Sequence, residues 1–350
     1  MNNGHANQAM RCFAVMIEAF FERVTAQNPE LECELVTVEP RNKHELPPAG
    51  CDLFLSSGGP GGPADHDGEP WLVEYRRLLD SIVEAHLRGL AQRPSMFGVC
   101  YTFELLIRHF EVAEMRLRDT RKFGVMPVYM TDAGMEHPLT ERFRDRLFAF
   151  EHRNWEAVGL DERKLAALGG RVLARESRDG ISKGRALLGL DFAPGIEGTQ
   201  FHPEADKPGV VAWLAKREQA EAFVAAYGKV TYEKMLQTLD NPERIAKTFT
   251  LLIPGWLTRK FNELAEARGW RALPPPVVDI ELFAGEAPPA VSVAHPSLLP
   301  PPMPRAKPAS VPKLLAASMC FDDESHAIDA AFLRPLERDL DPALVDDGAA

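Results

Sequence analysis

The sequence predicts an α/β fold: a doubly wound, flavodoxin-like, mostly parallel sheet with an added antiparallel layer. Strand patterns alternate with amphipathic helix patterns over the first 110 residues, which is typical of parallel sheets with helical crossovers. Beyond residue 120, strand patterns follow one another with short connections, which is typical of antiparallel pairing. The chain has 350 residues, of which 45% are hydrophobic, so it can bury a sizeable core.

The alternating part opens with apolar residues at helical spacing, and its strands are short apolar runs bounded by turn residues. The run "CDLFLSS" leads into the glycine-rich "GGPGGP", and "SMFGVC" leads directly into a helix pattern. In chain order we expect a helix at 8–24, strands at 33–39 and 51–57, a helix at 71–90, a strand at 95–100 and a helix at 101–110.

The second part adds strands before it returns to helix. We expect strands at 123–131, 146–153, 171–177, 185–191 and 195–202, followed by one helix at 210–227. Residues 1–228 are therefore assigned to one domain that contains both the parallel core and the antiparallel layer.

The beginning of the chain lacks an expected strand. A doubly wound domain normally opens with a strand that lies centrally in the sheet, whereas "MNNGH" resembles the loop after such a strand. A missing central strand would leave unpaired backbone groups in the core. We therefore expect the first strand to be missing at the N-terminus and the natural start to lie upstream.

Three smaller segments follow the domain. Residues 229–270 are expected to form a helical extension, with helices at 231–239 and 242–267. Residues 271–320 are expected to be a disordered linker, because 12 of the 29 prolines lie between residues 271 and 315. Residues 321–350 form an acidic tail that includes one short helix pattern.

Composition excludes several classes of protein. The formal net charge is −11, and the tail carries −7 of it, so the rest of the chain is nearly neutral and offers no basic surface for nucleic acid. The five cysteines show no spacing typical of a disulfide framework or a zinc site. No apolar run is long enough to span a membrane, and the N-terminal stretch shows no apolar h-region of a signal peptide. We therefore expect a cytoplasmic protein without nucleic-acid or membrane partners.

A cysteine stands at the corner between a predicted strand and a predicted helix. In "GVCYT", Cys100 would be exposed at the end of the sheet, with the free N–H groups and positive field of a helix N-terminus behind it. Such a position favours a reactive thiolate. Alternatively, the cysteine simply packs in the core, as buried cysteines at strand ends commonly do.

Two further stretches favour chemistry at this corner. In "SSGGPGGP", glycines would let the backbone turn its N–H groups toward an oxyanion. In "GTQFHPEAD", His202 could deprotonate Cys100, and Glu204 could orient the imidazole ring. The alternatives are an ordinary glycine-rich turn and a surface histidine beside a solvated glutamate.

These three stretches, in this order, resemble the class I glutamine amidotransferases, whose motifs are "SGGPxxP", "GxCxGxQ" and "QFHPE". The resemblance covers roughly residues 1–228 and describes a free-standing domain similar to the amidotransferase half of GMP synthases. It implies that Cys100 attacks the side-chain amide of L-glutamine, that His202 transfers protons and that Glu204 orients His202. The backbone N–H groups of Gly59 and Tyr101 would form the oxyanion hole. Ammonia would pass to a separate synthase partner, because no nucleotide-binding "GxxxxGK[ST]" motif is present.

The chain departs from the family pattern at two positions of the elbow. Thr102 replaces a glycine and needs more room between strand and helix. Glu104 replaces a glutamine of the substrate site; it could repel the α-carboxylate of glutamine, bind its ammonium group or face solvent. In "FEHRNW", Arg153 and Asn154 could bind the α-carboxylate on a loop; alternatively, Arg153 is a surface ion-pair partner.

Other functions remain open at this point. The same fold resembles that of hydrolases acting on other γ-glutamyl or amide substrates, an interpretation favoured by Thr102 and Glu104. A retired scaffold that binds or regulates is disfavoured by the intact cysteine, histidine and glutamate. No cofactor or metal is expected: His66 with Asp65 and Asp67 could offer ligands, but nothing at ligand spacing completes a shell, so a polar loop is favoured.

Overall fold

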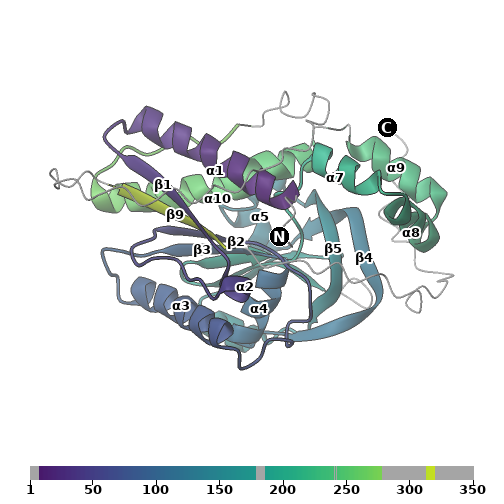
Figure 1. Ribbon diagram of the computed structural model, residues 1–350, viewed down its shortest axis with the longest axis horizontal. Helices are drawn as coiled ribbons and strands as arrows, with labels where there is room; N and C mark the ends of the chain where they lie inside the picture. The colour runs from purple at the N-terminus through teal and green to yellow at the C-terminus, as the bar shows by residue number, and fades with distance from the viewer. Residues whose placement is uncertain (1–7, 179–185, 240, 242, 278–312, 320–350) are drawn as a thin grey trace.

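The computed structural model describes residues 8–178, 186–239, 241, 243–277 and 313–319 (Figure 1). Its described strands are β1 Glu32–Val38, β2 Leu53–Ser56, β3 Ser95–Val99, β4 Glu114–Met130, β5 Arg146–Val158, β6 Arg171–Arg175, β7 Leu187–Ala193, β8 Ile196–Thr199 and β9 Lys313–Met319. Its described helices are α1 Gln8–Gln27, α2 Pro40–Lys43, α3 Pro70–Leu87, α4 Tyr101–Phe110, α5 Asp132–Glu136, α6 Glu162–Ala167, α7 Lys207–Leu214, α8 Arg217–Tyr227, α9 Lys229–Leu239 and α10 Ile245–Arg268, with a 3₁₀ turn, η1, at Glu141–Phe143.

The described strands form one sheet in the order β1-β9-β2-β3-β8-β7-β5-β4-β6. The first five pair in parallel, and the remaining neighbours pair antiparallel. The mixed α/β class with an added antiparallel layer is therefore confirmed. Since the carboxyl ends of β9, β2, β3 and β8 meet at one edge, the residues that follow these strands gather there.

Strand β9 is the main departure from expectation. It pairs in parallel with β1 on one side and with β2 on the other, so Ala316 lies opposite both Leu35 and Leu53. Part of the segment expected to be linker is thus a central strand, and the sheet position expected for an opening strand is filled by Lys313–Met319. The sequence pattern places these seven residues in the linker because they come directly after the proline-rich run. They are one lysine followed by six uncharged residues. Residues 278–312 and the acidic tail lie outside the described residues.

Helices cover both faces of the parallel part of the sheet (Figure 1). On one face, α1 and α10 pack together, with Phe20 against Phe261 and Trp256 against Phe97 of β3. On the other face lie α3 and α4, which bury Tyr75 and Leu106. Region 229–270 is therefore not only an extension, because α10 forms one layer of the main core. No helix of the described segments is long and apolar enough to cross a membrane.

A smaller core lies beside the antiparallel strands. Helices α7, α8 and α9 pack near β4 and β5, with Phe223 and Met235 buried against Phe123. The single helix expected at 210–227 is two helices, because the chain leaves helical geometry at Lys216, whose φ and ψ are −71° and 116°. This turn lets α8 fold against the middle of β4, where Phe223 contacts Phe123 and Tyr227 donates to Arg121 O.

Candidate active site

Cys100 occupies a strained corner between β3 and α4. Its φ is +54° and its ψ is −108°, although non-glycine residues rarely adopt positive φ. The corner is held by backbone bonds on both sides: Cys100 N donates to Thr199 O at 2.8 Å, and Glu104 N donates to Cys100 O at 3.1 Å. Strain of this kind persists only where the surrounding structure enforces it, and it is typical of a nucleophile elbow.

The glycine-rich loop after β2 runs directly against the thiol. A Cβ atom built on Gly58 would lie 2.8 Å from Cys100 Cβ, 3.4 Å from Cys100 Sγ and 3.3 Å from His202 Cε1. Only glycine therefore fits between the thiol and the imidazole ring. Gly59 follows in the same loop, and Tyr101 is the first residue of α4, whose opening N–H groups have no intrahelical acceptor.

His202 and Glu204 lie together at the same edge of the sheet. His202 Nδ1 is 2.7 Å from Glu204 Oε1, and Glu204 is 1% exposed. Strand β5 fixes the backbone here, because His202 N donates to Phe150 O at 2.8 Å. Burial opposes the charged imidazole, but the charges of Glu204 and Cys100 and their hydrogen bonds outweigh it, so the pKa of His202 is raised well above its ordinary value. The structure thus places a thiol beside an imidazole ring that a buried carboxylate holds through Nδ1.

Thr102 is accommodated by a glycine of the preceding strand, β3. A Cβ atom on Gly98 would lie 2.5 Å from Thr102 Cγ2, so the absence of a side chain there supplies the room that Thr102 needs. The Thr102 hydroxyl donates to Ser57 O at 2.8 Å and lies 2.8 Å from Ser56 Oγ. Ser57 N in turn donates to Met319 O of β9 at 2.8 Å. The base of the glycine-rich loop is therefore fixed by the elbow on one side and by β9 on the other.

Glu104 is buried, so the alternative that it faces solvent is wrong. Glu104 is only 4% exposed, and its Oε1 accepts a hydrogen bond from Gln200 Nε2 at 3.0 Å. Burial raises the pKa of Glu104 to about 8, against the opposing effects of that hydrogen bond and of the charges of Arg153 and His202.

Arg153 does not lie on a loop and is not a surface residue. It belongs to β5, is 3% exposed and forms ion pairs with Glu151 at 2.6 Å and Glu176 at 3.1 Å. Its guanidinium is thus occupied by two buried carboxylates, which leaves Asn154, an exposed residue, as the accessible member of the predicted pair. Trp155 reaches the glycine-rich loop, with Cζ2 3.0 Å from the Cβ position of Gly62.

Two supporting residues were not singled out from the sequence. His152 presents its carbonyl oxygen 4.0 Å from Cys100 Sγ, and its ring packs on Trp213 with centroids 5.5 Å apart. Arg11 of α1 pairs with Asp206 at 2.5 Å, and Asp206 Oδ1 accepts from Gly209 N, which fixes the segment after Glu204. The sequence signal for His152 was its position within "FEHRNW"; Arg11 carried none, because it lies 195 residues from its partner.

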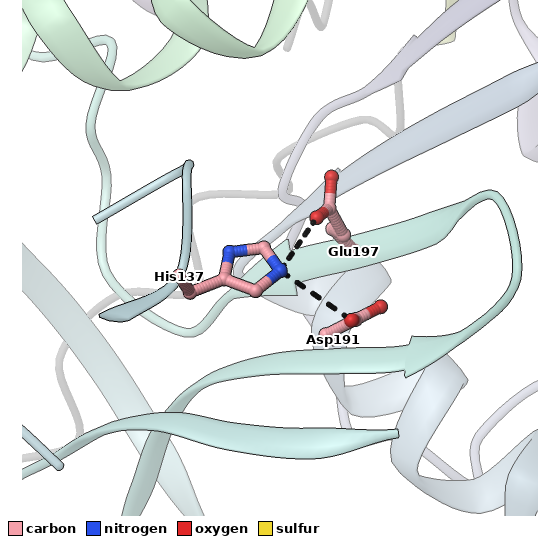
Figure 2. A group of neighbouring side chains, drawn as sticks. All are labelled: His137, Asp191 and Glu197. Atoms are coloured by element: carbon pink, nitrogen blue, oxygen red, sulfur yellow. Dashed lines mark ion pairs between the residues drawn. The ribbon is translucent and has the colours of Figure 1, made fainter. Parts of the chain in front are cut away.

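One group of side chains has the composition of a metal site. His137 Nε2 points between Asp191 and Glu197, at 3.4 Å and 3.6 Å from their carboxylate oxygens (Figure 2). However, His137 Nδ1 accepts a hydrogen bond from Leu139 N at 3.2 Å, so a neutral ring carries its proton on Nε2, the atom that a metal would need. Arg259 also pairs with Glu197. The group is therefore best described as an ion cluster that joins α10 and the α5 region to the sheet.

The polar side chains of the loop at 64–69 pair with one another and with neighbouring segments, including α4. His66 Nδ1 lies 2.9 Å from Glu69 Oε1, and Asp67 pairs with Arg108 at 2.6 Å. Asp65 accepts from Gly62 N and so stabilises the turn of the glycine-rich loop. These contacts agree with the interpretation of this stretch as a polar loop.

No protein-family model matches the chain, and no curated protein matches it. Several solved structures, however, are similar to the chain. A glutamine amidotransferase from Thermotoga maritima is 18% identical over 65% of this chain and 96% of its own, with a TM-score of 0.45. A glutamine amidotransferase from Methylobacillus flagellatus is 19% identical over 67% of this chain and 84% of its own, with a TM-score of 0.44. The glutaminase domain of Trypanosoma brucei CTPS, solved with bound acivicin, is 14% identical over 55% and 80%, with a TM-score of 0.38.

The chain is similar to these solved structures, and its motifs resemble those of the class I glutamine amidotransferases. At identities of 14–19%, the residues of this chain decide what chemistry it can perform.

Proposed function

We propose that the chain is a cysteine-dependent glutamine amidotransferase that releases ammonia from L-glutamine through a thioester. The observation that carries the proposal is the backbone of Cys100, which is held at φ +54° between a parallel strand and a helix, beside His202 and under Gly58. A thiol with no chemical role has no need for such a conformation. The buried carboxylate of Glu204 behind His202 completes the arrangement that a nucleophilic thiol requires.

In the first half-reaction, Cys100 Sγ attacks the side-chain amide carbon of glutamine. The carbonyl oxygen becomes an oxyanion, to which the N–H groups of Gly59 and Tyr101 donate. The C–N bond then breaks as His202 gives its proton to the leaving nitrogen, which departs as ammonia. A γ-glutamyl thioester on Cys100 remains, with His202 neutral.

In the second half-reaction, water attacks the thioester carbon. His202 takes a proton from that water, the C–S bond breaks, and glutamate leaves. The thiolate of Cys100 and the imidazolium of His202 are restored. Throughout the cycle, Glu204 holds the His202 ring in place through Nδ1, which directs Nε2 toward the thiol.

We further infer that the ammonia is used by a separate synthase partner in the cytoplasm. The sequence of this chain holds no phosphate-binding "GxxxxGK[ST]" loop with which it could activate an acceptor itself. We also infer a flavodoxin-like core. If β9 is counted as the first strand, the parallel part β1-β9-β2-β3-β8 has the order 2-1-3-4-5 of that fold.

The purified chain is expected to release glutamate and ammonia in equal amounts from L-glutamine, and Cys100→Ala is expected to release neither. Cys51→Ala is the matched control, because Cys51 is also buried but precedes β2 at the opposite end of the strand. Both products are measured by coupled enzymatic assay. Release that persists in Cys100→Ala would contradict the proposal. If a γ-glutamyl anilide is cleaved and glutamine is not, the thiol chemistry stands with another γ-glutamyl substrate.

A further inference from the structure

A buried carboxyl group and a buried amide face each other next to the proposed active site. Glu104 lies one turn after Cys100 on α4, and Gln200 follows β8 two residues before His202. Gln200 is 0% exposed, and its Nε2 donates to Glu104 Oε1 at 3.0 Å. The other end of the amide, Gln200 Oε1, is buried and finds no hydrogen-bond donor within the segments that the structure describes.

The protonation state of Glu104 decides whether this arrangement is satisfied. If Glu104 is ionised, it has only acceptors and offers no donor to Gln200 Oε1, so the amide oxygen stays unpaired in the core. If Glu104 is protonated, its second oxygen becomes a donor to Gln200 Oε1. A carboxylic acid and a primary amide then form two hydrogen bonds in one ring, and no buried polar atom of the pair is left without a partner.

We propose that Glu104 is a neutral carboxylic acid that binds the Gln200 amide through both carboxyl oxygens and thereby positions His202 relative to Cys100. The pair connects the first turn of α4, which follows the thiol, to the end of β8, which leads into His202. Gln200 is fixed on its other side, because its N–H donates to Leu188 O at 2.9 Å. Glu104 is thus a positioning residue, and it reproduces with a proton what an amide side chain would do at the same place.

The surroundings of Glu104 agree with a neutral group. Burial raises its pKa to about 8, although the hydrogen bond from Gln200 and the charges of Arg153 on β5 and of His202 act in the opposite direction. Arg153 is compensated by Glu151 and Glu176, which weakens its effect. On α4 itself, the phenol of Tyr101 is the other titratable group that interacts with Glu104, and its own pKa is raised to about 12, so it is uncharged.

This inference predicts the pH dependence of the chain's stability and, if the proposed function holds, of its activity. An unfolded chain ionises Glu104 near its ordinary pKa, whereas the folded chain keeps the proton until about pH 8. The folded state therefore binds more protons between these values, and stability falls as pH rises through this window. Above pH 8 Glu104 ionises in the folded chain, the ring of two hydrogen bonds opens, and the rate of glutamine hydrolysis should fall.

Glu104→Gln tests the inference, because glutamine has the same shape, cannot ionise and can pair with Gln200 through two hydrogen bonds. The infrared spectrum of the wild type at pH 6.5 should contain the carbonyl band of a buried protonated carboxyl group, and this band should vanish in Glu104→Gln. The ratio of hydrolysis rates at pH 7 and pH 9.5 should be about tenfold larger in the wild type than in Glu104→Gln. Titratable groups that do not interact with Glu104 cancel in this comparison, and the infrared band reports on Glu104 separately from His202, whose charge interacts with it.

An ionised Glu104, shown by the absence of that band from the wild type at pH 6.5, would overturn the inference, as would equal rate ratios in two active proteins. The infrared measurement needs no substrate. If the chain does not hydrolyse glutamine but the band behaves as expected, the proposed function fails while the acid–amide pair stands.

Discussion

His202→Gln is expected to lower the rate of glutamine hydrolysis by about 10⁴-fold while leaving the fold intact. In the proposed mechanism, His202 is the acid that protonates the leaving nitrogen and the base that activates water. Glutamine fills a similar volume and can still hydrogen-bond Glu204, but it has no proton to exchange near neutral pH. The measurement is the steady-state rate at saturating glutamine, together with the thermal melting curve.

His109→Gln is the matched control for this prediction. The side chain of His109 is 12% exposed, as is that of His202, and it pairs with a carboxylate, Asp80, at 3.0 Å. It lies at the far end of α4 from Cys100, so its replacement should leave the rate within about twofold. Comparable losses in both variants would mean that His202 has no particular role in the chemistry.

Leu314→Ala is expected to destabilise the chain by about 3 kcal/mol. Leu314 lies on β9, is 0% exposed and belongs to the core that α1 and α10 form against the sheet. Truncating its side chain leaves a cavity between the sheet and the helices α1 and α10 that pack on it. The free energy of unfolding is measured from urea denaturation, and the slope of the transition shows whether unfolding remains two-state.

Lys313→Ala provides the comparison. The Lys313 side chain is 37% exposed and pairs with Glu34 at the surface, so its loss should change stability by less than about 1 kcal/mol. If Leu314→Ala is as mild as Lys313→Ala, then β9 does not occupy the centre of the sheet in solution. The contact between Met319 and Ser57 at the base of the glycine-rich loop would then also be absent.

The local part of this fold could be predicted from the sequence, and the long-range part could not. The corner at Cys100 was predictable because a strand, a nucleophile and a helix follow one another within a few residues. The position of β9 was not, because Ala317 pairs with Val36, which lies at the other end of the chain. Nothing in the local pattern of a short apolar run indicates which strands it will join.

The residues around the thiol show the same limit. Thr102 looked poorly suited to the elbow, yet Gly98 on the preceding strand supplies its space. Glu104 and Arg153 are charged residues that sequence analysis placed at a substrate site or on the surface, and both are buried against specific partners. Whether an ionisable side chain is buried, and which groups it then pairs with, depends on contacts between distant segments of the chain. Both become visible only in the folded structure.

Reaction with an electrophilic glutamine analogue tests the central claim most directly, because it requires no partner protein. A diazoketone in place of the side-chain amide puts its alkylating diazo carbon where the amide nitrogen was, next to the carbonyl carbon that Cys100 is proposed to attack, and releases N2 when the thiol is alkylated. Mass spectrometry of peptides should find one added group per chain, on Cys100, and excess L-glutamine should prevent the addition. A label on another cysteine, or labelling of Cys100 that glutamine does not slow, would contradict the assignment of this corner as a glutamine-binding thiol site.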